Sequence, residues 1–401
     1  GLYDQVALYK SKKETEPIVV LPVNKMVYNV IDEVIFSDQS YLANRHYKLI
    51  KLNEDASELK LYISAAMELN NDQVIHPKRL QKAIVENVGP FPPQSQMYVQ
   101  DQDLQQVMIE AWDYVVDWYL KCFDYFIENE GIEYIFSHLH SIDLIEHTFI
   151  RFMHGIGFNE YDTDVYAFWM ERLYQQTDRY LGGLLHYLDE GWTILVISDH
   201  GLLVPPEDDI PLLGDGFGCN IRVMEELGYT VLKKDENGNE LREIDYSKTR
   251  AVANRGNHIH INLKGRNQHG IVEPADKYAL ETQIISDLYN YRNAEGKRIV
   301  SIAMRNKEAE ILGLNGEESG DILYWLEEGF NRLHGDSLPT FQGMHESSVS
   351  PIFIAAGPGI KKNFVTERTI RTIDVAPTIA VLAGVAMPEQ CEGAPIYQIL
   401  E

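Results

Sequence analysis

The stretch Thr193-Ile-Leu-Val-Ile-Ser-Asp-His-Gly201 is the most informative part of this 401-residue chain for its fold. Its aliphatic run predicts a fully buried strand, and Gly201 allows a sharp turn after it. Ligands of α/β proteins bind at the carboxyl ends of such strands, which is where Asp199 and His200 stand. An aspartate oxygen beside an imidazole nitrogen suits zinc or manganese, so the stretch predicts part of a metal site.

A second pair of candidate ligands, Asp143 and His147, comes after the apolar run Glu133-Tyr-Ile-Phe-Ser137. That run predicts another buried strand, and the i, i+4 spacing puts both side chains on one face of a helix or helical turn. A helix predicted at 164–188 separates this strand from the one at 193–197. Strand, helix and strand in this order form a βαβ unit, which predicts an α/β fold with a parallel sheet.

Hydrophobic periodicity predicts further elements on both sides of this unit. The predicted strands are 19–22, 47–52, 59–63, 258–263 and 351–357, and the predicted helices are 103–129, 275–290 and 373–383. Gly131 is expected just after the first of these helices. The cluster Gly89-Pro-Phe-Pro-Pro93 is typical of a loop or boundary.

Composition excludes several classes of partner. The net charge of −26 argues against DNA or RNA as the main partner, because phosphate backbones are bound by clustered Lys and Arg. No run of about 18 apolar residues occurs, so no membrane-spanning segment is expected. The widely spaced Cys122, Cys219 and Cys391 form neither a disulfide framework nor a zinc motif. They favour a reducing, cytoplasmic compartment, unless a signal peptide is lost with a missing N-terminus.

A third candidate ligand, His345, lies in Gly343-Met-His345 ahead of an apolar run that begins near Ile352. Taken alone, His345 is equally well interpreted as a surface histidine that binds no metal. In order, DxxxH, SDHG at a strand end and GxH before an apolar strand resemble the alkaline phosphatase superfamily. Within it, the closest resemblance is to the type I phosphodiesterase/nucleotide pyrophosphatase branch. It covers roughly residues 130–401, including Ile261-Asn-Leu-Lys-Gly-Arg266 and Ile373-Asp-Val-Ala-Pro-Thr378.

The resemblance implies a three-layer sandwich around a mostly parallel sheet, with inserted cap segments, and two divalent metal ions. It assigns Asp143, His147 and His345 to one ion, and Asp199 and His200 to the second. Zinc is the favoured metal and manganese the alternative. Ions about 3.5–4 Å apart stabilise the attacking and leaving oxygens of a displacement at phosphorus. The implied activity is hydrolysis of a small-molecule phosphoester, of the phosphodiesterase or nucleotide pyrophosphatase type.

The resemblance also divides the chain into four expected parts. Residues 1–100 are a cap-like or inserted segment, and 101–205 form the core with the first two metal motifs. Residues 206–340 combine an insertion with core elements, and 341–401 complete the core with His345.

The chain departs from this family pattern in its first hundred residues. The family has an aspartate ligand and a Thr or Ser nucleophile well before DxxxH, and residues 1–100 offer neither. We therefore expect the nucleophile upstream of Gly1 and the second metal site to be incomplete in this chain, which makes the chain a poor or inactive enzyme. Glu346 stands where the family more often has glycine.

Two other functions stay open at this point. A phosphomonoesterase, sulfatase, phosphonate hydrolase or phosphomutase of the same superfamily would share these ligands. The missing nucleophile also favours a non-catalytic protein that binds a ligand or partner on the same fold.

Other polar residues near the motifs allow a functional and a structural interpretation. His138 and His140 are either second-shell groups of the metal site or solvent-facing and packed side chains. Arg266 either meets a substrate phosphate or forms a structural salt bridge. Structural or surface roles are expected for the rest, namely His258 and His260 on a strand, His334 and Asp336 in a loop, and Asp374 at a helix start.

Overall fold

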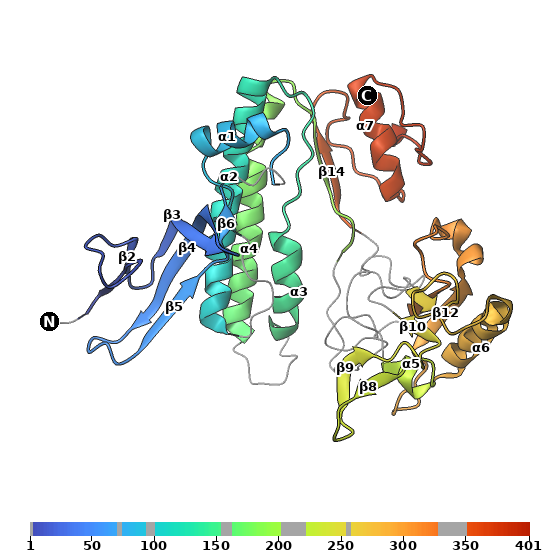
Figure 1. Cartoon of the computed structure of the whole chain (residues 1–401). Coiled ribbons are helices and arrows are strands. Elements are labelled where there is room, and N and C mark those ends of the chain that lie inside the picture. The colour runs from blue at the N-terminus through green and yellow to red at the C-terminus, as the bar shows by residue number, and fades with distance from the viewer. Residues whose placement is uncertain are drawn as a thin grey trace. The chain divides into compact units, whose positions relative to one another are not determined.

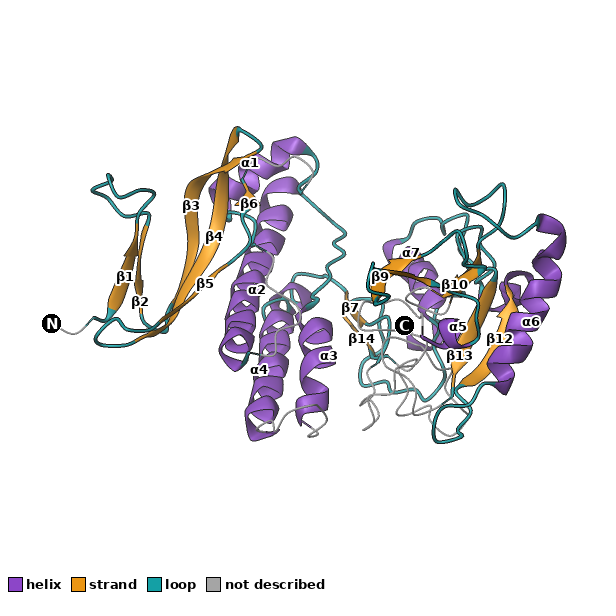
Figure 2. Cartoon of the chain, turned by 60° about the horizontal axis from the view of Figure 1, so that its bottom comes forward, coloured by secondary structure: helices purple, strands orange, loops and turns teal. Residues whose placement is uncertain are grey.

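The computed structural model describes residues 3–69, 74–93, 101–153, 163–201, 222–253, 258–327 and 351–401. The chain divides into two compact units, Gly1–Thr193 and Ile194–Glu401, and each is described here by itself. Both units mix helices with strands, which confirms the α/β prediction in its general form (Figures 1 and 2).

Unit 1 contains a hairpin, a larger antiparallel sheet and a group of helices. Its elements are β1 (Gln5–Leu8), β2 (Val19–Pro22), β3 (Met26–Phe36), β4 (Gln39–Leu52), β5 (Leu59–Ile63), β6 (Met67–Glu68), α1 (Lys78–Asn87), α2 (Gln102–Glu130), α3 (Ser141–Met153), α4 (Thr163–Gly182) and the 3₁₀ turn Leu185–Leu188. The strands β3, β4 and β5 pair in that order, and β6 pairs with β4. The predicted strands at 19–22 and 59–63 are confirmed residue for residue.

Unit 2 contains an antiparallel sheet, two separate strand pairs and shorter helices. Its elements are β7 (Ile194–Ile197), α5 (Arg222–Glu226), β8 (Leu232–Lys234), β9 (Glu240–Ile244), β10 (Ala251–Ala253), β11 (His258–Ile261), α6 (Lys277–Asn290), β12 (Val300–Arg305), β13 (Ile322–Leu326), β14 (Phe353–Ala356) and α7 (Val375–Ala383). Short 3₁₀ turns at Pro274–Asp276 and Thr372–Asp374 lead directly into α6 and α7. The helices predicted at 275–290 and 373–383 are therefore confirmed.

The central helix α2 shows why its boundaries were predictable. The Asp101 side chain accepts hydrogen bonds from the backbone N–H groups of Asp103 and Leu104, which caps the first turn. At the other end, Gly131 adopts the left-handed conformation with φ of 61°, which glycine reaches without steric cost. A core of α2, α3 and α4 side chains lies between these ends; its fully buried members are Ile145, Phe149, Tyr166 and Leu173.

The middle of strand β4 is buried on both faces, and the two faces differ in chemistry. Tyr47 and Leu49 pack with apolar side chains of the β1–β2 hairpin and β3. The opposite face presents Asn44, His46 and Lys48, all at most 1% exposed. Two of these polar side chains meet α2: Lys48 Nζ bonds the Glu110 carboxylate at 2.7 and 2.8 Å, and the His46 ring lies 4.9 Å from that of Tyr114. We call Asn44, His46 and Lys48 the polar face of β4.

We expect His46 to make unit 1 less stable in mild acid. The backbone N–H of Asn29 donates to His46 Nδ1 at 3.2 Å, so a proton on that nitrogen would break the bond. Burial lowers the pKa of His46 from 6.5 to about 4, although the Arg45 backbone acts in the opposite direction. The unfolded chain therefore takes up a proton below pH 6.5 that the folded chain refuses, and up to about 3 kcal/mol of stability is lost between pH 6.5 and 4.

The variant His46→Asn tests this, because its Oδ1 can accept the Asn29 hydrogen bond without titrating. Urea unfolding at a series of pH values should show a shallower pH dependence for the variant than for the wild type. Identical profiles for the two proteins would contradict the prediction.

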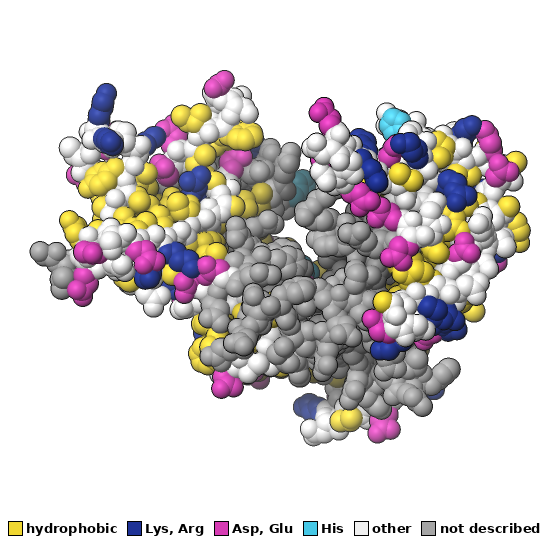
Figure 3. All heavy atoms as spheres, turned by 90° about the horizontal axis from the view of Figure 1, so that it is seen from below, with side chains coloured by type: hydrophobic (Ala, Val, Ile, Leu, Met, Phe, Trp, Pro, Cys, Tyr) yellow, Lys and Arg dark blue, Asp and Glu magenta, His cyan; other side chains and the backbone are white. Residues whose placement is uncertain are grey.

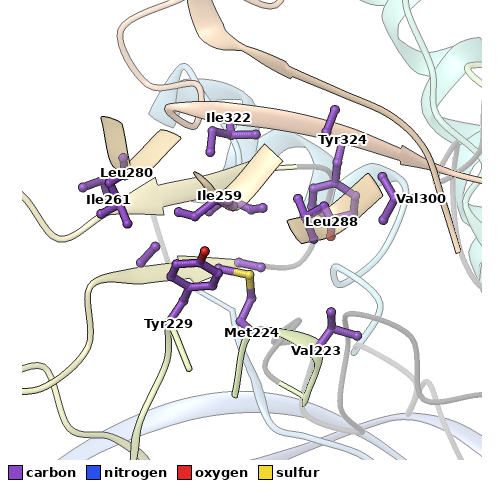
Figure 4. Close-up of a cluster of buried hydrophobic side chains, with 14 of the residues drawn as sticks. Val223, Met224, Tyr229, Ile259, Ile261, Leu280, Leu288, Val300, Ile322 and Tyr324 are labelled. Atoms are coloured by element: carbon purple, nitrogen blue, oxygen red, sulfur yellow. The ribbon is translucent and has the colours of Figure 1, made fainter. Parts of the chain in front are cut away.

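The core of unit 2 lies between its sheet, α5 and α6. The sheet has the strand order β10-β11-β13-β12, and Ile259, Ile261, Ile322 and Leu288 are fully buried in this core (Figure 4). Strand β13 is buried at every residue, as its apolar sequence Ile322-Leu-Tyr-Trp-Leu326 favours. The strand predicted at 258–263 is confirmed in β11.

The parallel sheet expected from the βαβ pattern is wrong for the described residues. Residues 133–137 form no strand, and Tyr134 and Phe136 are 60% and 71% exposed. Strand β7 pairs antiparallel with β14, and every ladder between named strands in the described ranges is antiparallel. A parallel sheet needs covering layers on both faces, and the exposed side chains of 133–137 have no such cover.

Apolar side chains are also exposed on the sheet of unit 1. Side chains that are at least half exposed include Ile35, Phe36 and Leu42 in the β3–β4 hairpin. Yellow side chains gather at the left of Figure 3, on the side where Figure 1 shows β1 to β5.

Within the described residues, no helix is both long enough and apolar enough to span a bilayer.

Candidate metal centre

Helix α3 carries the first predicted ligand pair. Asp143 lies in its first turn, where the partial positive charge of a helix start favours a carboxylate. The backbone of His147 lies in the same helix one turn later, which confirms the i, i+4 arrangement on a helix. Ile145 and Phe149 are fully buried in the helical core. Asp143 stands two residues before Ile145, so the helical period places it on a different face of α3.

His140 bonds the Asp143 carboxylate directly. Its Nε2 lies 2.8 Å from Asp143 Oδ2, and the two side chains are 42% and 21% exposed. The ring of His138 lies 4.8 Å from that of His140 at an angle of 31°. This contact favours the interpretation in which His140 orients a metal ligand over the one in which it only faces solvent or packs.

The second predicted pair, Asp199 and His200, lies just after β7 in unit 2. His200 Nδ1 is 2.8 Å from the Gly201 carbonyl oxygen, and Ser198 Oγ donates to the His200 carbonyl at 2.7 Å. Because a carbonyl only accepts, Nδ1 carries a proton, and in the neutral ring Nε2 then has the lone pair. His200 Nε2 lies 3.7 Å from Asp199 Oδ2. An oxygen and a nitrogen of the kinds that bind metal ions are therefore close together.

The exposure of this second pair differs from the prediction of a fully buried strand. The strand β7 is only half-buried, with Ile197 38% exposed, because it has a ladder partner on one side among the described residues. The Asp199 side chain is 84% exposed, whereas that of His200 is 16% exposed.

Several predicted positions lie outside the described residues. They include the third ligand His345 with its neighbour Glu346, the loop residues His334 and Asp336, and Cys219. Over the ranges that the structure describes, no three His, Cys, Asp or Glu side chains converge as a metal site requires. The donor types that are described, a carboxylate and imidazoles, are those that zinc and manganese take.

Arg266 forms a structural salt bridge, the second of the two roles that the sequence allows. Its Nη1 and Nη2 bond the two oxygens of Asp321 at 2.7 and 2.6 Å, and Nη2 also donates to the Ile261 carbonyl at 2.6 Å. Lys277 Nζ approaches the same carboxylate at 3.0 Å. Asp321 is only 4% exposed. The guanidinium therefore holds the end of β11 to the start of β13.

The other described residues with a predicted structural role also make structural contacts. The backbone N–H of Gly320 donates to His258 Nδ1 at 3.0 Å, and burial lowers the pKa of His258 and His260. Asp374 accepts hydrogen bonds from the backbone N–H groups of Arg371 and Ala394, both at 3.0 Å. These bonds close the 3₁₀ turn Thr372–Asp374, but the Asp374 side chain makes no capping hydrogen bond to α7, so the predicted cap of this helix is wrong.

The hydrogen bond between His140 and Asp143 was not predicted as such from the sequence. The i, i+3 spacing indicates it, since a residue just before a helix and one three positions later are neighbours on the helix surface. This indication is weak because the orientation of a side chain at a helix start depends on the backbone that leads into it.

Comparisons with known proteins give a limited similarity. The chain is 25% identical over 143 residues to N-acetylglucosamine-6-sulfatase of Bos taurus, a match that covers 35% of this chain and 25% of the relative. It is 25% identical over 142 residues to N-acetylglucosamine-6-sulfatase of Capra hircus, with the same coverage. The chain thus spans about a quarter of the length of these curated relatives. No protein-family model and no solved structure matches the chain.

Proposed function

We propose that this chain is part of a metal-dependent hydrolase that cleaves esters of phosphate or sulfate, as in the alkaline phosphatase superfamily. The observation that carries the proposal is Asp143, fixed in the first turn of α3 with His147 one turn later in the same helix. The adjacent donors Asp199 and His200 after β7 support it. The similarity to two sulfatases supports an ester hydrolase in general.

In this proposal, Asp143, His147 and His345 hold one divalent ion, and Asp199 and His200 contribute to a second. When bound, such ions polarise the ester and lower the pKa of a bound water or nucleophile. The Nδ1–H of His200 bonds the Gly201 carbonyl, which fixes the tautomer that presents Nε2 as a donor. We propose that the remaining carboxylate ligand and the Thr or Ser nucleophile are supplied from outside residues 1–401.

The substrate class has two candidates. The order of the DxxxH, SDHG and GxH motifs favours a phosphodiester or a nucleotide anhydride. The similarity to N-acetylglucosamine-6-sulfatase favours a sulfate ester as the second candidate. Side-by-side turnover of bis-p-nitrophenyl phosphate, p-nitrophenyl phosphate and p-nitrophenyl sulfate separates them. This comparison belongs in a form of the protein extended upstream of Gly1 wherever the gene encodes such residues.

Metal binding to the chain itself tests the site without the nucleophile. Asp143→Ala should weaken Mn²⁺ or Zn²⁺ binding at least about tenfold, because it removes a charged ligand from the first site. Isothermal titration of the untagged protein measures the affinity. Asp164→Ala is the matched control, since Asp164 is an exposed carboxylate in the first turn of the neighbouring helix α4.

Equal affinities for the wild type and Asp143→Ala would contradict the proposed site. So would an extended, metal-loaded protein that turns over none of the three esters.

A further inference from the structure

We propose that His140 is a positioning residue that orients the Asp143 carboxylate for metal binding, an inference that rests on the proposed function. His140 Nε2 lies 2.8 Å from Asp143 Oδ2. An ionised carboxylate only accepts hydrogen bonds, so Nε2 of His140 carries the proton and donates it. A metal-bound carboxylate commonly uses one oxygen for the metal while the other accepts such a bond.

Contacts on both sides hold the His140 backbone in place. On its C-terminal side, the Leu144 N–H donates to the His140 carbonyl at 3.1 Å, which makes His140 the residue from which α3 starts. On its N-terminal side, Ser137 Oγ and Tyr180 OH lie 2.5 Å apart and tie the incoming segment to α4. The imidazole is thus presented to the first turn of α3 by a backbone attached at two points.

The His138 ring packs beside the imidazole of His140. Its centroid lies 4.8 Å from that of His140, and within the described residues the two rings share no hydrogen bond. His138 therefore offers ring packing, and His140 offers packing together with a hydrogen bond to the carboxylate. This difference lets an experiment separate positioning from packing.

The experiment compares Mn²⁺ affinity in untagged variants of residues 1–401. His140→Leu keeps apolar bulk and loses the donor, so affinity should fall about 10- to 100-fold. His140→Gln places an amide NH₂ about where imidazole Nε2 lies, so affinity should return to within about threefold of the wild type. His140→Asn places its amide too close to the backbone and should not rescue. His138→Leu should change affinity less than about threefold.

Two further measurements keep the outcome interpretable. Thermal unfolding followed by circular dichroism shows whether each variant keeps the wild-type fold. The Mn²⁺ electron paramagnetic resonance spectrum reports the symmetry of the metal environment, which should change in His140→Leu and recover in His140→Gln.

The outcomes distinguish this inference from the function on which it rests. If Asp143→Ala binds Mn²⁺ as tightly as the wild type, the proposed metal site fails and this inference fails with it. If Asp143→Ala weakens binding while folded His140→Leu does not, the positioning role alone is overturned. Equal losses in His138→Leu, His140→Leu and His140→Gln would assign the effect to ring packing and also overturn it.

Discussion

Asp321→Asn is expected to destabilise unit 2 by about 2–3 kcal/mol, because a neutral amide replaces a buried carboxylate that accepts hydrogen bonds from a cation and from a buried backbone N–H. Asp321 is 4% exposed and accepts hydrogen bonds from Arg266 and from the backbone N–H of Ile261 at 2.7 Å. An asparagine would turn an NH₂ group toward one of these donors. The cations of Arg266 and Lys277 would then lack their shared carboxylate.

The same carboxylate gives a pH signature. Burial by itself raises the pKa of Asp321, but the Arg266 and Ile261 hydrogen bonds and Lys277 lower it from 3.8 to about 2. A folded-state pKa below the unfolded value gives stability that is fully present above about pH 4 and is lost as the pH falls to about 2. The contribution is about 2 kcal/mol.

Hydrogen exchange measured on peptides from β11 and β13 reports the stability of this unit separately from unit 1. Exchange there should accelerate strongly in Asp321→Asn and stay near the wild type in Asp276→Asn. Asp276 is the matched control because it is an exposed aspartate whose side chain makes no capping hydrogen bond to α6. Similar protection in both variants would show that the buried carboxylate contributes little.

Glu110→Ala is expected to cost unit 1 about 3–5 kcal/mol, whereas Lys48→Met should cost much less. Lys48 is 1% exposed and Glu110 is 26% exposed, so the partners are unequal. Removing Glu110 leaves a positive charge inside the protein. Removing Lys48 leaves a carboxylate that water reaches and that Gln106 Nε2 still bonds at 2.9 Å.

Urea unfolding of the two single variants and the double variant Lys48→Met/Glu110→Ala measures this asymmetry. The double variant should be more stable than Glu110→Ala, because it no longer buries an unpaired charge. Gln106→Ala serves as a control that removes a hydrogen bond from an uncharged donor to the same partly exposed carboxylate, with a loss of about 1 kcal/mol. Equal losses in Lys48→Met and Glu110→Ala would contradict the argument.

Local signals predicted much of the fold. Asp101 and Gly131 bound α2 as capping chemistry predicts, and β2 and β5 match their predicted ranges. The failure is at residues 133–137, whose apolar side chains favour a strand but form no ladder. Strand formation depends on a partner far away in sequence, and β7 finds its partner in β14, more than 150 residues later. The order of motifs could not reveal this pairing or its antiparallel direction.

The candidate site was predictable to a similar degree. The helical spacing of Asp143 and His147 follows from sequence alone, because a helix fixes the relation of residues four apart. The hydrogen bond from His140 to Asp143 does not follow from the sequence in the same way. It depends on how the segment before α3 is held, which involves Ser137 and the distant Tyr180.

The polar face of β4 also constrains how the strand can align with its neighbours. A slip of one residue would turn Asn44, His46 and Lys48 toward the apolar β1–β2 hairpin and would point Tyr47 and Leu49 at Glu110. An ammonium group would then meet hydrocarbon, and the glutamate would lose its cation. Misaligned pairings of the long β3–β4 hairpin are thus penalised twice, so the chemistry buried beside α2 selects one alignment among those that backbone hydrogen bonding alone would allow.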